Sequence, residues 1–119
     1  MSAICDNMNI MKRTEKEIIP YTNQQAKQPI IDWLENLDKK TRTRIVARFS
    51  RIALGNYGDC KVIGDGIKEL RFDFGPGYRI YFGEDGEKII ILLLGGDKSN
   101  QSKDIQQAKE YWNDYINGR

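Results

Sequence analysis

Residues 71–82, RFDFGPGYRIYF, join two runs of alternating apolar and polar side chains through a Gly-Pro-Gly turn. A period of two residues is typical of a half-buried strand, and a short glycine-rich linker between two such runs predicts a β-hairpin. We therefore expect strands over 67–74 and 78–83. Alternation gives one face the apolar set Leu70, Phe72, Ile80 and Phe82, and the other face the polar set Arg71, Arg79 and Tyr81.

Three further strands are expected around this hairpin. Residues 60–63 precede it and residues 88–94 follow it, across the tight linkers GDG and EDG. The run IIILLL at 89–94 shows no alternation, as expected of a central strand that is covered on both faces. A short strand over 16–21 contains Pro20, which cannot donate to a ladder and so favours an edge position.

Three helices are predicted by apolar residues that recur with a helical period. The first begins at Pro29, the second runs from Asp38 to about Leu54 and is stopped by Gly55, and the third spans 102–117. The order β-α-α-β-β-β-β-α predicts an α+β fold. We expect a mostly antiparallel twisted sheet, an N-terminal helical hairpin and a C-terminal helix.

Length and composition predict one domain without membrane segments. The 119 residues, 39% hydrophobic and 30% charged, suffice for a single domain, expected over 15–119 after a flexible leader of residues 1–14. The apolar run at 89–94 is far shorter than the roughly 18 residues of a membrane-spanning helix. The N-terminus lacks the features of a secretory signal, so we expect a cytoplasmic protein.

The sequence lacks the histidines and closely spaced cysteines that usually bind a metal ion. Cys5 and Cys60 lie far apart, and the sequence contains no histidine. We therefore expect neither a metal site nor another cofactor, and no disulfide framework. Because the usual general base near neutral pH is also missing, acid–base chemistry would have to use Lys, Tyr, Asp or Glu.

Positive charge is concentrated in residues 39–51, which hold six basic side chains and no acidic one, although the net charge of the chain is only +2. Within this segment Arg44, Arg48 and Arg51 form a stripe on the second predicted helix. Such a stripe is consistent with a solvated face, with contact to RNA, or with docking of an acidic protein segment. The candidate RNA- and ribosome-binding residues are Lys68, Arg44, Arg48, Arg51 and Lys103.

The polar face of the predicted hairpin has two interpretations. Arginines that pair across strands with Glu69 or Asp73 would complete an ordinary solvent-facing sheet. Alternatively, two guanidinium groups beside a tyrosine ring would bind phosphate groups and stack a base, and both are useful on RNA.

The segment GGDKS at 95–99 follows a hydrophobic strand, as a phosphate-binding loop would. The phosphate-loop pattern requires Lys directly after its second conserved glycine, and here Asp97 intervenes. We interpret Gly95 and Gly96 as a chain reversal that presents Lys98 beside the sheet, with a solvated loop lysine as the alternative.

The chain also carries an ordered series of motifs: WL, RFSRIALGNYGD, VIGDG, ELR, GPGYRIYF and LLLGGDKS. Over about residues 15–115 this series resembles the HigB-like branch of the RelE/ParE toxin superfamily, also called addiction-module killer proteins. The resemblance implies a RelE-like fold with a concave basic face and the toxin half of a bacterial type II toxin–antitoxin pair. The implied partners are an antitoxin, expected to be a helix-turn-helix protein, and the ribosome with its mRNA.

Toxins of the RelE and HigB type cut mRNA in the ribosomal A site, so the resemblance implies a metal-independent endoribonuclease. Carried over to matching positions, it implies an active surface that lies on one solvent-accessible face and consists of Arg71, Arg79, Tyr81 and Lys98. The arginines suit stabilisation of phosphorane charge, Lys98 suits proton transfer, and Tyr81 suits base stacking or proton donation.

Two alternatives stay open on the same scaffold. One is a ParE-like inhibitor of gyrase that has no nuclease activity, and the other is an inactive relative that binds RNA or protein. Some members of the superfamily use histidine, which this chain lacks, so the resemblance does not identify the acid and the base.

Overall fold

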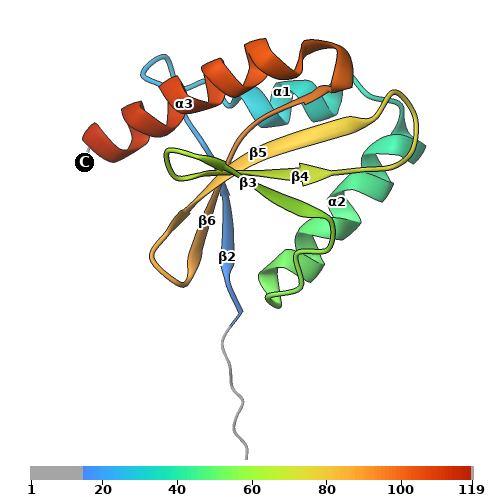
Figure 1. Cartoon of the computed structure of the whole chain (residues 1–119), viewed down its shortest axis with the longest axis horizontal. Coiled ribbons are helices and arrows are strands. Elements are labelled where there is room, and N and C mark those ends of the chain that lie inside the picture. Colours follow the sequence, from blue (N-terminus) through green and yellow to red (C-terminus); the bar gives the residue numbers. More distant parts are fainter. Residues whose placement is uncertain (1–14, 119) are drawn as a thin grey trace, which may run out of the picture.

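The computed structural model describes residues 15–118, so the leader expected over 1–14 lies outside the described residues. Strands and helices follow one another in the predicted order (Figure 1). They are β2 (Glu17–Pro20), α1 (Pro29–Glu35), α2 (Lys39–Ala53), β3 (Cys60–Gly64), β4 (Ile67–Arg71), β5 (Tyr78–Asp85), β6 (Ile89–Asp97), a 3-10 turn (Lys98–Asn100) and α3 (Gln101–Asn117). The predicted α+β class is confirmed.

The five strands form one twisted sheet in the order β2-β6-β5-β4-β3. β2 pairs with β6 in parallel, and the other neighbours are antiparallel, which confirms the mostly antiparallel sheet. β2 lies at one edge, where Pro20 costs the sheet no ladder hydrogen bond.

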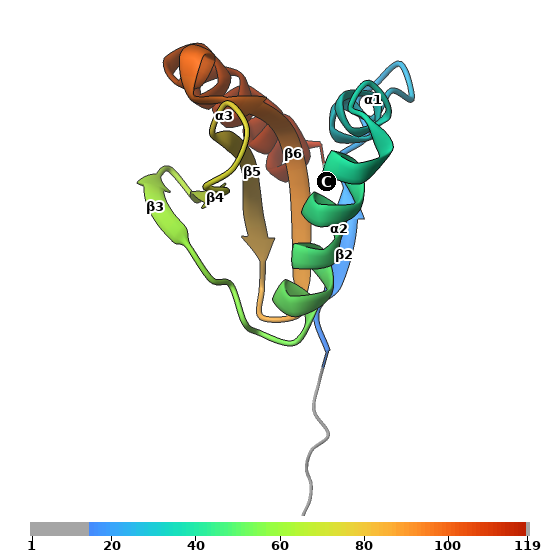
Figure 2. The ribbon, with the colours of Figure 1, turned by 90° about the vertical axis from the view of Figure 1, so that its right-hand side faces the viewer.

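Helices cover both faces of the sheet (Figure 2). α1 and α2 pack on one face and α3 packs on the other, so that each helix buries its apolar stripe against strands. The helical residues at the centre of these two cores are Ile30, Leu34, Ile45 and Ile52 on the first face, and Ala108 and Trp112 on the second.

β6 lies between the two cores. Ile90 and Leu92 pack beneath α1 and α2, whereas Ile91 and Leu93 pack beneath α3. Burial on both faces explains why the sequence of this strand does not alternate. The longest apolar run is therefore a strand, and no helix within residues 15–118 is long and apolar enough to span a bilayer.

Local signals set the ends of several elements. Asp38 caps α2 by accepting a hydrogen bond of 3.0 Å from the backbone N–H of Thr41. Between β3 and β4, Asp65 and Gly66 adopt φ values of 54° and 85°. Positive φ at both central residues is the geometry of a type I′ turn, which matches the twist of the strands it joins.

The interpretation of Gly95 and Gly96 as a chain reversal is wrong. Both residues belong to β6, which continues to Asp97 and pairs with β5 from Ile89 to Asp97, with one register shift at Leu93. A side chain at Gly95 would collide with the ring of Trp33, and one at Gly96 would collide with the carboxylate of Asp104. These glycines therefore allow α1 and α3 to approach the sheet closely from its two faces.

We predict that Phe72→Ala lowers the free energy of unfolding by about 3–5 kcal/mol, because a large buried aromatic ring is removed from the core. Phe72 is 4% exposed and lies in the core beneath α1 and α2. Urea denaturation of the variant beside Val62→Ala, at an apolar residue that is 70% exposed, provides the measurement and its control. Equal losses from the two variants would contradict the assigned core.

Candidate functional site

The β4–β5 hairpin presents its polar residues on the face that α3 covers. Arg71 and Arg79 lie directly opposite each other in the antiparallel pair, and Tyr81 belongs to the core cluster beneath α3. The predicted apolar set lies in the core on the other face: Leu70, Phe72, Ile80 and Phe82. The predicted separation of the two sets is confirmed.

Three of the four predicted active-site residues meet at one end of the sheet. Arg71, Arg79 and Lys98 line an open hollow of about 560 Å³ beside the β4–β5 turn, which we call the arginine–lysine hollow. β6 brings Lys98 to this place because the strand ends at Asp97, and the stem of Lys98 packs against Gly77 of the turn. The hollow therefore offers three positive groups from three segments of the chain.

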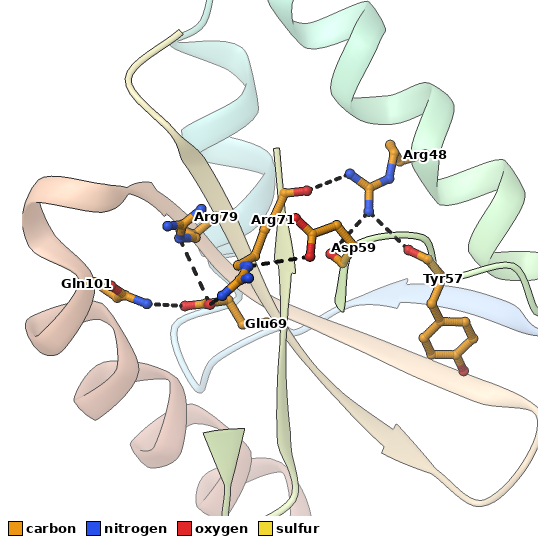
Figure 3. A network of polar contacts seen from close by, with 7 residues as sticks. All are labelled: Arg48, Tyr57, Asp59, Glu69, Arg71, Arg79 and Gln101. Atoms are coloured by element: carbon orange, nitrogen blue, oxygen red, sulfur yellow. Dashed lines mark hydrogen bonds and ion pairs between the residues drawn. The ribbon is translucent and has the colours of Figure 1, made fainter. Parts of the chain in front are cut away.

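Beneath these arginines lies Glu69, whose side chain is fully buried (Figure 3). Its Oε1 lies 3.9 Å from Nε of Arg79 and 4.0 Å from Nη1 of Arg71. Its Oε2 accepts a hydrogen bond of 2.7 Å from Gln101 at the start of α3. Nε of Arg71 lies 3.5 Å from the exposed carboxylate of Asp59, so both arginines have acidic neighbours within the sheet region.

The expectation that Tyr81 is solvent-accessible is wrong. The residue is fully buried beneath α3, on the polar face but beyond the reach of a substrate in the arginine–lysine hollow. Burial raises the pKa of its hydroxyl, and the nearby charge of Glu69 raises it further. Tyr81 can therefore neither stack on a base nor donate a proton directly in this arrangement.

Arg48 supports the site from α2. Its guanidinium donates hydrogen bonds to the backbone carbonyls of Arg71 at 2.7 Å and Tyr57 at 3.0 Å (Figure 3). The same group lies over the ring of Phe72, with its central carbon 4.6 Å from the ring centroid. These contacts occupy the guanidinium and tie α2 to β4, which opposes the expected role of Arg48 in RNA binding.

Arg44 and Arg51 flank a second open groove, of about 470 Å³, between α2 and the β4–β5 turn. Arg44 lies over the ring of Phe74, 3.7 Å from its centroid. Asp59 and Asp73 lie in both this groove and the arginine–lysine hollow, so the two depressions adjoin. The predicted basic stripe therefore borders the site, with acidic side chains between them.

The last two candidate RNA-binding residues lie apart from the hollow. Lys68 precedes Glu69 in β4 and therefore points to the opposite face, where its Nζ lies 2.6 Å from Glu84 Oε1. Tyr57 donates a hydrogen bond to the same carboxylate and lies beneath the Lys68 ammonium. Lys103 is exposed on the first turns of α3.

Sequence reasoning missed two residues of the site. Asp59 lies in the loop before β3, where no periodic pattern indicates direction, and Gln101 contacts Glu69 only because α3 crosses the sheet. The sequence pattern predicts Glu69 only as a possible partner of arginines on a solvent-facing sheet, whereas its side chain is buried beneath α3. Within residues 15–118 no group of acidic or cysteine side chains could hold a metal ion.

Comparison with known proteins agrees with the motif series. Residues 32–112 match the family model described as phage derived protein Gp49-like (DUF891). The chain belongs to this family. A Haemophilus influenzae (strain ATCC 51907 / DSM 11121 / KW20 / Rd) protein, described only as uncharacterized, is 50% identical over 78 residues, which are 65% of this chain and 79% of the relative.

The Gp49-like family is of the addiction-module killer, RelE-like type, which indicates a toxin of a toxin–antitoxin pair with an antitoxin as its partner. The matched residues 32–112 include the arginine–lysine hollow, Glu69 and Gln101. Family membership thus concerns the part of the chain that carries the candidate site.

We predict that Arg48→Ala and Arg51→Ala differ in stability. Loss of the hydrogen bonds from a charged guanidinium to backbone carbonyls should lower the free energy of unfolding by at least about 1.5 kcal/mol in Arg48→Ala. Arg51 is exposed, so Arg51→Ala should stay within about 0.5 kcal/mol of the parent protein. Chemical denaturation measures both, and equal effects would show that Arg48 is an ordinary surface residue.

The Glu84 carboxylate should make stability pH-dependent. Burial by itself would raise its pKa, but hydrogen bonds from Lys68 and Tyr57 outweigh burial and lower the pKa below the ordinary value of 4.5. A lowered pKa means that the stabilisation is present above pH 4.5 and is lost as the pH falls from there through the folded-state pKa. Thermal unfolding between neutral and acid pH should therefore show a steeper acid loss in the parent protein than in Glu84→Gln; parallel profiles would refute this.

Proposed function

We propose that the chain halts translation as the toxin of a type II toxin–antitoxin pair, by cutting ribosome-bound mRNA without a metal ion. The arginine–lysine hollow carries the proposal, because Arg71, Arg79 and Lys98 converge on one open depression large enough for a nucleotide phosphate and its sugar. Planar guanidinium groups match the oxygens of a phosphate, and a lysine adds a mobile ammonium. The match to a family of the addiction-module killer type supports the same assignment.

Cleavage of RNA by its own 2′-hydroxyl requires three things of a site. The proton of that hydroxyl must leave, the added negative charge on phosphorus must be balanced, and the departing 5′-oxygen must gain a proton. Arg71 and Arg79 are the groups proposed to balance the charge, and Lys98 is proposed to move a proton because it is exposed at the edge of the hollow. Burial of Tyr81 removes it from direct proton transfer.

One lysine and two partly buried arginines offer few groups with which to orient an RNA substrate, so we propose that a second component orients it. Holding reactants in place lowers a barrier by several kcal/mol, and the ribosome is proposed to supply this by fixing mRNA in its A site. Arg44 and Arg51 are exposed beside the adjoining groove, Lys103 is exposed on α3, and these three side chains are proposed to contact ribosomal RNA, whose phosphates attract them. An antitoxin that covers the hollow would silence the protein.

We predict that Lys98→Ala abolishes growth arrest and mRNA cleavage, because it removes the exposed ammonium from the hollow without opening a core. Addition of the purified variants to a reconstituted translation system, followed by primer extension on the mRNA, maps any cut sites. Lys27→Ala removes another exposed lysine, from the loop before α1, and is the matched control, expected to cut like the parent protein.

The same preparations should be tested in a DNA supercoiling assay. Blocked supercoiling with intact mRNA would replace the proposal by gyrase inhibition. If the folded protein affects neither translation nor supercoiling, the remaining interpretation is an inactive relative that binds RNA or protein. If Lys98→Ala and Lys27→Ala both cut mRNA at the parent rate, the hollow is not the site of cleavage.

A further inference from the structure

A buried carboxylate under a hollow that should bind phosphate needs a physical explanation. Glu69 brings negative charge directly beneath Arg71 and Arg79, which would weaken the attraction of the hollow for an anion. The geometry points to Glu69 as a positioning residue: it fixes the guanidinium groups of Arg79 and Arg71 so that their outer edges face an RNA phosphodiester. This inference rests on the proposed function of the hollow.

The first argument is the pairing of the strands. Arg71 and Arg79 occupy directly opposite positions of the β4–β5 ladder, where like charges repel and would turn their side chains apart. Oε1 of Glu69 lies at nearly equal distances from the two guanidinium groups, 3.9 Å from Arg79 and 4.0 Å from Arg71. One carboxylate between two arginines allows both to stay on the same side of the sheet.

The second argument is the two-sided placement of Arg79. Its side chain is 14% exposed, and its Nε is buried and faces Glu69. Because the residue also lines the arginine–lysine hollow, the remaining part of its guanidinium is what a phosphate can reach. An arginine with one edge attracted to a buried carboxylate and the other edge free has a preferred orientation before a ligand arrives.

The third argument is that Glu69 is itself held, but not fully satisfied. Gln101 donates to Oε2, which anchors the carboxylate to the first turn of α3. Within residues 15–118, Glu69 Oε1, Arg79 Nε and Tyr81 OH are buried polar atoms without a hydrogen-bond partner. Buried polar atoms without partners are rare, and here they gather around the carboxylate that faces the proposed phosphate-binding arginines. The ion pairs of 3.9 Å and 4.0 Å are therefore the contacts through which Glu69 acts on the two arginines.

The test compares Glu69→Gln with Asp73→Asn. Glutamine keeps the size of Glu69 and can still accept the hydrogen bond from Gln101, but it removes the charge that holds the arginines. Asp73 is an exposed acidic residue near the same hollow, and Asp73→Asn therefore reports the effect of one lost negative charge alone. Two readouts are needed, one of arginine order in the free protein and one of cleavage.

Nitrogen-detected NMR of arginine side chains gives the first readout. The Nε–H signal of Arg79 should be protected from solvent exchange in the parent protein and in Asp73→Asn, and should lose this protection in Glu69→Gln. The second readout is single-turnover cleavage of ribosome-bound mRNA. Relative to Asp73→Asn, Glu69→Gln should slow cleavage about tenfold or more, as expected for misplaced catalytic groups, with little change in the ribosome concentration that gives half-saturation.

A folded Glu69→Gln variant that keeps the Arg79 signal protected, or that cuts as fast as Asp73→Asn, would overturn the inference while the proposed function stands. If the parent protein cuts no mRNA, the proposed function fails, and the exchange of the Arg79 signal alone decides whether Glu69 positions the arginine. Should Glu69→Gln fail to fold, Gln101→Ala takes its place, because it leaves the charge but frees the carboxylate. It should show the same losses, and parent-like behaviour would again overturn the inference.

Discussion

The packing of α3 across the sheet is the constraint on which the site depends. The ring of Trp112 lies against Gly66 and Gly83, so the helix lies close to the strands and seals the polar face of the hairpin there. Tyr81 and Glu69 lie under this cover, whereas Arg71 and Lys98 lie beyond the start of the helix and reach solvent. The place where α3 begins therefore decides which polar residues of one strand face can meet a ligand.

Because α3 covers that face, the carboxylate of Glu69 is buried away from water, where a charged group is unfavourable. A buried Glu side chain is tolerated only if cations and hydrogen-bond donors surround it, and here β4, β5 and α3 each supply one. The arginines that balance Glu69 are the same arginines that line the hollow. Arg48 extends the network to α2 by binding the carbonyl of Arg71. Stability and the proposed chemistry thus draw on one set of contacts, so a variant at Arg79 disturbs both and tells less about the site than one at Lys98.

Element order, the hairpins and the apolar core could be predicted from the sequence, because periodicity and turn residues report directly on local geometry, whereas the parallel pairing of β2 with β6 has no such local signal. The face of each hairpin residue could be predicted for the same reason. The solvent accessibility of these residues could not be predicted from the sequence. Alternation places Tyr81 and Arg79 on the same face, but it does not reveal that α3 covers Tyr81 and leaves Arg79 at the edge of a hollow. The role of Gly95 and Gly96 could not be predicted, because the close approach of Trp33 on α1 and Asp104 on α3 depends on how the helices pack and leaves no local signal.

The stripe Arg44, Arg48 and Arg51 shows why charge pattern alone does not predict function. Helical spacing directs all three toward the same side of α2, yet one lies over Phe74, one binds backbone carbonyls, and one is exposed beside the groove. The difference arises from the loop between α2 and β3, which folds back so that the carbonyls of Tyr57 and Asp59 reach Arg48. An arginine whose guanidinium binds backbone carbonyls, as that of Arg48 does, is not available to a phosphate of RNA. Of the three arginines in the stripe, Arg44 and Arg51, which lie in the groove that adjoins the hollow, are therefore the positive groups that RNA could still contact.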